Sequence, residues 1–227
     1  MNKFEIDTQL VLAATVHDVK NSLGLINAEI ESVISEITES QPHAAKVLRE
    51  ILIESSRINN GLMHMLGLYR FNKNTLALKV DEIMVLDVIE DMASRYVSSL
   101  EHLGIELDIQ IDDELSWYLD PTLVEGILHN VITNSIRYTK KKITISAEVE
   151  DNWLSIVLMD DGDGYPEVML NCLHDHGDIN FKTRSTGLGI FFSEQIAKMH
   201  QDDEREGYIE LANDPETHGA VFTLKLP

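Results

Sequence analysis

The sequence has little cysteine and no long apolar run. Its single cysteine, Cys172, cannot form an intramolecular disulfide or supply a multi-cysteine zinc site. No stretch approaches the roughly 20 consecutive apolar residues that a membrane-spanning helix needs. The apolar stretch from Leu10 to Val16 is too short for a span and lacks the cleavage pattern of a signal peptide. We therefore expect a cytoplasmic protein, in a reducing compartment, with no membrane insertion.

Positive charge is also scarce. Among 227 residues, 18 Lys and Arg stand against 39 Asp and Glu, which gives a formal net charge of −21. Nucleic acids and anionic membranes both require a basic face on their partner, so the charge balance argues against either. Hydrophobic residues make up 44% and charged residues 25%, which is enough apolar content for a folded core. The length suits one large domain or two small ones.

Two apolar seams mark the N-terminal third of the chain. Within residues 5–38, apolar residues recur in alternating steps of four and three: Leu12, Val16, Val19, Leu23, Ile26, Ile30, Val33 and Ile37. After a turn at 38–42, a second seam has the same spacing: Ala44, Leu48, Ile51, Ser55, Ile58, Leu62, Met65 and Tyr69. Such seams are typical of helices that pack lengthwise. Two long helices joined by a short turn predict an antiparallel helical hairpin.

A hairpin alone leaves half of each seam exposed to water. We therefore expect two copies of the chain to form a homodimeric four-helix bundle. The alternative is that the hairpin packs on the rest of its own chain.

The remainder of the chain mixes helical and strand patterns. The patterns predict helices at 85–102, 121–139 and 187–200 and antiparallel-style strands at 105–111, 142–149, 153–159, 207–212 and 219–226. This mixture indicates an α+β fold, in which an α/β sandwich with helices on one face of a sheet follows the hairpin. We divide the chain into a hairpin at 1–71, a linker at 72–79 and a second domain at 80–227.

The first candidate site is His17-Asp18-Val19-Lys20-Asn21. His17 and Asn21 are four residues apart and share a helix face, and Asp18 is adjacent to the imidazole. A neutral imidazole attacks phosphorus well when one nitrogen is free and the other gives its proton to a carboxylate. By itself, a histidine on a helix surface is more often simply solvated.

A second candidate is an asparagine pair on the helix predicted at 121–139. Asn130 and Asn134 share a face, and Arg137 follows three residues later. Carboxamide oxygens can bind Mg²⁺ without adding charge near phosphates, and arginine binds phosphate directly. A polar helix face is the simpler explanation of this pair taken alone.

Two glycine-rich motifs follow. Asp160, at the end of an apolar strand, can accept a hydrogen bond from an exocyclic amine such as that of adenine, and Gly162 and Gly164 let the backbone approach a flat base. The segment 185–190, Ser-Thr-Gly-Leu-Gly-Ile, opens a helix whose first N–H groups can bind phosphate. Each motif is weak alone. Together with the asparagine pair, and in this order along the chain, they supply a metal ligand, a carboxylate that can recognise a base, and backbone N–H groups that can bind phosphate.

With these motifs the chain resembles the two-component sensor histidine kinases over nearly its whole length. Residues 1–71 resemble their dimerisation and histidine-phosphotransfer hairpin, with 17–21 as the H box. Residues 80–227 resemble their ATP-binding catalytic domain, of the Bergerat type shared with DNA gyrase and mismatch-repair ATPases. Asn130 and Asn134 match the N box, and the two glycine-rich motifs match the glycine boxes.

The resemblance implies roles for individual residues. His17 would be the phosphoacceptor and Asp18 the general base, and Asn21 stands where the family orients water to dephosphorylate a partner's aspartyl phosphate. Asn134 would hold Mg²⁺, Asp160 would read the adenine amino group, and Tyr138 would pack near the base. The implied ATP-binding residues are Asn130, Asn134, Arg137, Tyr138, Asp160, Gly162, Gly164, Lys182, Arg184, Thr186, Gly187, Leu188 and Gly189.

The implied activity is ATP-dependent autophosphorylation of His17, with ATP and Mg²⁺ as cofactors. The implied partner is the receiver domain of a response regulator, whose aspartate takes the phosphoryl group. Two alternatives remain open: a histidine phosphotransfer adaptor with a degenerate domain that binds no nucleotide, and a regulator phosphatase with little kinase activity.

Some residues depart from the family pattern. Ser22 replaces the usual proline after the H box, so we expect a less kinked helix there. Phe181 is the only phenylalanine between Pro166 and Thr186, where the family has a paired-Phe lid, and Ser185 replaces a usual glycine. Only sixteen residues precede His17, so we expect no sensor domain before the hairpin and possible input from a separate sensor protein.

Overall fold

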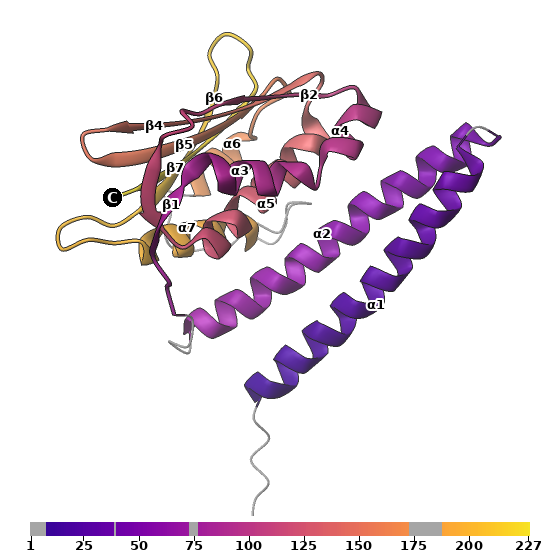
Figure 1. Cartoon of the computed structure of the whole chain (residues 1–227), viewed down its shortest axis with the longest axis horizontal. Helices are drawn as coiled ribbons and strands as arrows, with labels where there is room; N and C mark the ends of the chain where they lie inside the picture. The colour runs from indigo at the N-terminus through magenta and orange to yellow at the C-terminus, as the bar shows by residue number, and fades with distance from the viewer. Residues whose placement is uncertain (1–7, 39, 73–76, 173–187) are drawn as a thin grey trace, which may run out of the picture. The chain divides into compact units, whose positions relative to one another are not determined.

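A computed structural model describes residues 8–38, 40–72, 77–172 and 188–227 of the chain (Figure 1). The chain divides into two compact units, Met1–Ala77 and Leu78–Pro227. Among the described residues, no helix combines the length and the apolar character needed to cross a membrane.

The first unit is a pair of antiparallel helices, α1 (Thr8–Ile37) and α2 (Pro42–Asn72) (Figure 1). The two helices predicted from the seams are therefore present. Pro42 stands at the first position of α2, where a missing N–H costs nothing. At Ser22, where we expect less kinking, α1 continues without a break and the Ser22 hydroxyl donates to Asp18 O at 2.9 Å.

The second unit contains a five-stranded sheet in the order β2-β4-β5-β7-β6. Its strands are β2 (Glu106–Gln110), β4 (Lys142–Glu150), β5 (Trp153–Asp160), β6 (Tyr208–Asn213) and β7 (Ala220–Leu226). The neighbours β4, β5, β7 and β6 pair antiparallel, but β2 and β4 are parallel. The expectation of antiparallel-style strands throughout is therefore wrong for β2. Its long connection to β4 contains a helix, which returns the chain to the same end of the sheet.

The helices pack beside this sheet. They are α3 (Val85–Ser94), α4 (Val97–Leu103), α5 (Pro121–Tyr138), α6 (Glu167–Cys172) and α7 (Leu188–Met199). Figure 1 shows α3, α5 and α7 on one face of the sheet, as expected for this fold class. The core between the two layers contains fully buried side chains from both, including Ile127, Leu128, Ile132, Ile143, Ile145, Leu154, Ile156, Leu158 and Phe222.

Two local features differ from the sequence prediction. The helix expected at 85–102 is interrupted, because Arg95 and Tyr96 bond three residues back, to Met92 and Ala93, rather than four. A separate antiparallel pair, β1 (Asp81–Met84) and β3 (Ser116–Leu119), was not predicted. Each of these strands has four residues, too few to establish an alternating pattern.

A buried histidine holds the start of α5. The Asp120 side chain caps the helix by accepting from Leu123 N at 3.0 Å and also accepts from Lys79 N at 2.8 Å. His200 Nε2 accepts from Asp120 N at 3.0 Å, while His200 Nδ1 lies 2.9 Å from Ile196 O. These contacts assign a neutral ring with its proton on Nδ1. Burial lowers the pKa of His200, in spite of the Ile196 carbonyl and the Asp120 charge, which raise it.

This arrangement predicts a pH-dependent stability. Because the folded His200 resists protonation, the unfolded chain binds the extra proton as the pH falls below about 6.5, and the free energy of unfolding falls with it. Burial lowers the pKa of His129 as well, so His129 also makes the free energy of unfolding fall as the pH falls. We expect His200→Gln, which does not titrate, to flatten the slope between pH 7.5 and 5.5 by up to about 1.4 kcal/mol per pH unit.

Denaturant titrations followed by tryptophan fluorescence measure this slope, since Trp117 and Trp153 both lie in the second unit. His102→Gln, at an exposed position in α4, is the matched control and should keep the wild-type slope. An unchanged slope in His200→Gln would show that His200 does not carry the effect.

Candidate functional site

One helix, α5, presents the candidate polar residues on one side. Asn130 is buried, whereas Asn134 and Arg137, further along the helix, are exposed. The Asn130 carboxamide lies directly against the backbone of Gly189 at the start of α7. A Cβ atom at Gly189 would stand 2.3 Å from Asn130 Oδ1 and 2.5 Å from its Nδ2. The structure therefore brings one residue of each motif, Asn130 and Gly189, together, and a side chain at position 189 would require the Asn130 carboxamide to move.

The Asp160 carboxylate is held in place at the end of β5. Its Oδ1 accepts hydrogen bonds from Gly162 N at 2.9 Å and Ala220 N at 3.2 Å. Asp160 is buried, and no hydrogen bond among the described residues is recorded for its second oxygen, Oδ2. Two N–H donors thus orient the carboxylate and leave Oδ2 as the oxygen that can accept from an amine.

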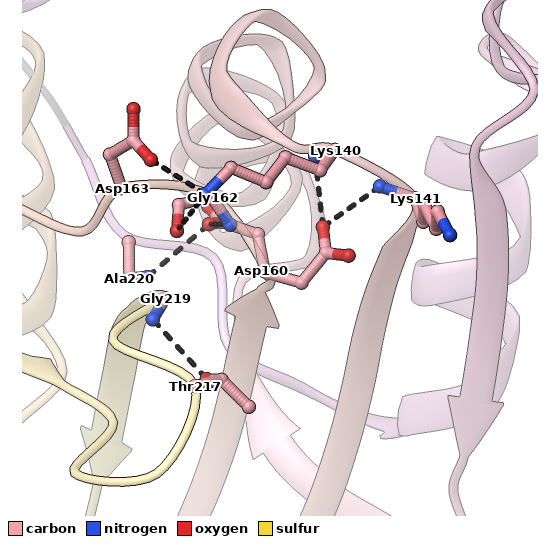
Figure 2. A network of polar contacts seen from close by, with 9 residues as sticks. Lys140, Lys141, Asp160, Gly162, Asp163, Thr217, Gly219 and Ala220 are labelled. Carbon is pink, nitrogen blue, oxygen red and sulfur yellow. Dashed lines mark hydrogen bonds and ion pairs between the residues drawn. The ribbon is translucent and has the colours of Figure 1, made fainter.

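Two glycines, Gly162 and Gly219, lie close to Asp160 (Figure 2). A Cβ atom at Gly219 would stand 1.7 Å from Asp160 O, and one at Gly162 would stand 2.6 Å from Tyr138 O. Glycine is therefore required at both positions because a side chain would collide with neighbouring backbone, and not because of an unusual φ angle. Gly162 places the end of α5 against the loop after β5, so Tyr138 and Asp160 belong to the same site.

Gly164 needs its glycine for two reasons. Its φ of 75° is one that L side chains rarely adopt, and a Cβ atom would stand 2.5 Å from His218 O. The next residue is fixed by a side chain, because Asn213 Oδ1 accepts from Tyr165 N at 2.6 Å and Asn213 Nδ2 donates to Tyr165 O at 3.0 Å. Sequence analysis gave no role to Asn213 or Gly219. An asparagine at a strand end and a glycine after a turn are common, so neither carries a distinct signal.

Lys140 crosses the outside of the same loop. Its Nζ lies 2.6 Å from Asp163 Oδ1 and donates to Gly162 O at 3.5 Å (Figure 2). The hydrogen bond and the negative charge of Asp163 raise the pKa of Lys140. Both side chains are exposed, so this ion pair contributes little to stability.

Tyr138 ends α5 with a largely exposed ring, 57% accessible to solvent. The guanidinium carbon of Arg137 lies 5.6 Å from the centre of that ring, within range of a cation–π contact. An exposed aromatic ring next to the Asp160 loop offers a surface on which a flat base can stack.

The three candidate residues of the first unit also lie together, on α1. His17 Nδ1 is 3.6 Å from Asp18 Oδ1 and 3.3 Å from Asn21 Nδ2. The His17 and Asp18 side chains are 71% and 83% exposed. In the tautomer with its proton on Nδ1, the ring points that N–H toward Asp18 and leaves Nε2 as the nitrogen that can act as a nucleophile, whereas Asn21 Nδ2 can donate to Nδ1 only in the other tautomer. A neighbouring carboxylate can take the Nδ1 proton as a bond forms at Nε2.

The remaining sequence-predicted residues are not placed. Lys182, Arg184, Thr186 and Gly187 lie outside the described residues, as do Phe181 and Ser185. Leu188 is the first residue of α7, and its side chain is not described.

Taken together, the residues of the second unit fit a nucleotide with its metal ion. The site has a fixed carboxylate, close approach at four glycines, and an exposed carboxamide and guanidinium along α5. Among the residues that the structure describes, no cluster of three or more His, Cys, Asp or Glu side chains could hold a metal. A Mg²⁺ ion that accompanies a nucleotide takes most of its ligands from phosphates and water, and the exposed Asn134 carboxamide is a side chain of the kind that could add one oxygen.

Comparisons with known proteins agree with this geometry. Residues 119–227 match the family of histidine kinase-, DNA gyrase B- and HSP90-like ATPases. The sensor protein SrrB of Staphylococcus aureus strain N315 is 23% identical over 223 residues, an alignment that covers 95% of this chain and 37% of SrrB. The chain therefore spans little more than a third of that relative's length.

Two solved structures share the fold. Full-length ShkA in complex with AMPPNP matches 97% of this chain and 46% of its own, with a TM-score of 0.66 and 17% identity. The histidine kinase AdeS of Acinetobacter baumannii matches 87% of this chain and 94% of its own, with a TM-score of 0.60 and 20% identity. Residues 119–227 thus form an ATPase domain of the histidine kinase-, DNA gyrase B- and HSP90-like family, and the chain is homologous to the sensor histidine kinases.

Proposed function

We propose that this protein is an ATP-dependent protein-histidine kinase. It transfers the γ-phosphoryl group of ATP to His17 and then to an aspartate of a response regulator receiver domain. The observation that carries the proposal is the convergence of three distant motifs in one site. Asn130 packs on Gly189, and Asp160 is held beside Gly162 and the end of α5.

In this proposal the second unit binds the nucleotide. Asp160 Oδ2 accepts a hydrogen bond from the adenine amino group, and Tyr138 packs against the base. Asn134 and Arg137 face the phosphates, and the Asn134 carboxamide oxygen holds Mg²⁺. When bound there, Mg²⁺ would supply positive charge that neutralises the phosphates and favours attack at the terminal phosphorus.

The chemistry takes place at His17. Nε2 attacks the γ-phosphorus, and the bond from that phosphorus to the oxygen of the ADP leaving group breaks. The proton on Nδ1 passes to Asp18, which leaves a neutral phosphohistidine. In the second step a receiver aspartate attacks the phosphorus, the phosphorus–nitrogen bond breaks, and His17 takes back its proton. The chain contributes mainly positioning and charge stabilisation.

The close contacts favour a kinase over a histidine phosphotransfer adaptor that binds no nucleotide. Gly162, Gly189 and Gly219 each stand where a Cβ would collide with the Asp160 or Asn130 regions. Asp160 and Asn134 also keep the side-chain chemistry that ATP and Mg²⁺ require. An adaptor that binds no nucleotide would not need Asp160 and Asn134, or the glycines that let the backbone pack closely around the site.

The direct test is labelling with ATP that carries radioactive phosphorus at the γ position, in the presence of Mg²⁺. We expect the wild-type chain to take up an acid-labile, base-stable label. His17→Gln should lose it completely, because glutamine has no nucleophilic nitrogen.

His43→Gln, at another exposed histidine of the hairpin, is the matched control and should keep the label. Label that persists in His17→Gln contradicts the assignment of the phosphoacceptor. A wild-type chain that takes no label and binds no ADP supports the adaptor instead.

We also propose that two copies associate through the hairpin into a four-helix bundle. The supporting observation is the exposure of seam residues on both helices, between 43% and 54%: Ile26, Val33, Ile51, Ile58 and Met65. Two adjoining hairpins would remove these side chains from water, each contributing about 0.7–1.5 kcal/mol, because roughly half of each side chain is already buried.

Substitutions on this seam test the dimer. We expect the wild-type chain to sediment at about twice its 25.7 kDa mass, whereas Ile26→Glu/Ile58→Glu should be monomeric, because the dimer would bury four unpaired carboxylates. Leu25→Glu, at an exposed position off the seam, should remain dimeric. A monomeric wild-type chain at micromolar concentration would refute the bundle.

A further inference from the structure

Asp161 makes an unusual set of contacts for a residue to which sequence analysis gave no role. Its Oδ1 accepts hydrogen bonds from three successive backbone N–H groups, those of Lys140 at 2.9 Å, Lys141 at 2.9 Å and Lys142 at 3.2 Å. Its own N–H donates to Lys142 O at 3.3 Å. We call this set of bonds the Asp161 clasp.

The clasp joins two segments that the sheet no longer holds together. The β4–β5 ladder ends at the pair Ile143–Asp160, so Asp161 is the first residue beyond it. On the other side, Lys140 follows shortly after the last residue of α5, Tyr138. The clasp therefore fixes the exit of α5 against the start of the loop that carries the glycine motif.

The residues held by the clasp are those around the Asp160 carboxylate. Asp161 stands between Asp160 and Gly162, and Gly162 N is one of the two donors to Asp160 Oδ1. Gly162 also packs against Tyr138 O, with no room for a Cβ. A shift at Asp161 would move the Gly162 N–H donor and the end of α5 relative to the carboxylate.

A charged acceptor suits this position. Burial alone raises the pKa of Asp161, but the backbone hydrogen bonds from Lys141, Lys142 and Lys140 outweigh it, so the pKa lies below its usual value. The side chain is therefore an anion at neutral pH, and an anion makes stronger hydrogen bonds to N–H groups than a neutral amide oxygen does.

We propose that Asp161 is a positioning residue for base recognition. Its clasp holds Asp160 and Tyr138 in the geometry that selects an adenine carrying an exocyclic amine. The inference rests on the proposed binding of ATP in this site. Asp161 does not itself contact the nucleotide, so its loss should weaken the selection of the base more than the binding of the phosphates.

The test compares the binding of Mg·ADP and Mg·IDP by calorimetry, because inosine has a carbonyl oxygen where adenine has the amine. We expect the wild-type chain to prefer ADP by about 100-fold, since a carboxylate repels that oxygen. In Asp161→Ala, ADP affinity should fall about tenfold while IDP affinity changes little, which lowers the preference about tenfold. Asp161→Asn keeps one acceptor oxygen, so its preference for ADP should lie between that of the wild-type chain and that of Asp161→Ala.

Asp202→Ala is the matched control. The Asp202 side chain also accepts from two backbone N–H groups, of Glu204 at 3.0 Å and Arg205 at 2.8 Å. Arg205 donates to Asn152 O, at the opposite end of β5 from Asp160, so the Asp202 turn is remote from the site. The melting temperature of this variant measures the loss of stability when an aspartate that caps a turn is removed. Its preference for ADP should stay at the wild-type level.

The possible results separate the two claims. If the wild-type chain prefers ADP and Asp161→Ala keeps the full preference, the positioning role is overturned and the proposed function stands. A loss of affinity for both nucleotides by the same factor also overturns the positioning role, because general destabilisation would explain it. If the wild-type chain binds neither nucleotide, the proposed function fails, and this inference fails with it.

Discussion

The site depends on the two hydrogen bonds that Gly162 and Ala220 donate to Asp160 Oδ1. They come from segments about sixty residues apart in the chain, and they meet only because β5 and β7 are neighbours in the sheet. Glycine at 162 and 219 is the steric condition for this meeting, since any side chain would push the backbone away from Asp160. A carboxylate oriented in advance loses little freedom when it accepts a bond from a ligand.

The helix α5 links this carboxylate to the rest of the second unit. Its first turn is capped by the Asp120 side chain. The backbone N–H of Asp120 in turn donates to the neutral ring of His200, the residue that follows α7. Its middle carries Asn130 against Gly189, and its last residue, Tyr138, touches the Asp160 loop through Gly162. Because one helix makes all three contacts, Asp160 at one end of the site and Gly189 at the other keep a fixed separation.

Sequence reasoning succeeded where a pattern extends over many residues or where a motif carries its own chemistry. The seams predicted α1 and α2, and the Asp160 motif was placed correctly at the end of a strand. It failed for features defined by contact between distant segments. Nothing in the sequence around Asp161 or Asn213 indicates which backbone groups their side chains bind. The apolar pattern of 85–102 also gives no sign of the change to three-residue hydrogen bonds at Arg95 and Tyr96.

The central claim is that Asp160 accepts a hydrogen bond from bound adenine. A crystal structure of the chain with Mg²⁺ and a non-hydrolysable ATP analogue tests it most directly. The account predicts the adenine amino nitrogen within about 3.2 Å of Asp160 Oδ2, the base against Tyr138, and the phosphates beside Asn134. A nucleotide bound elsewhere, or a saturated crystal with no nucleotide at Asp160, would contradict it.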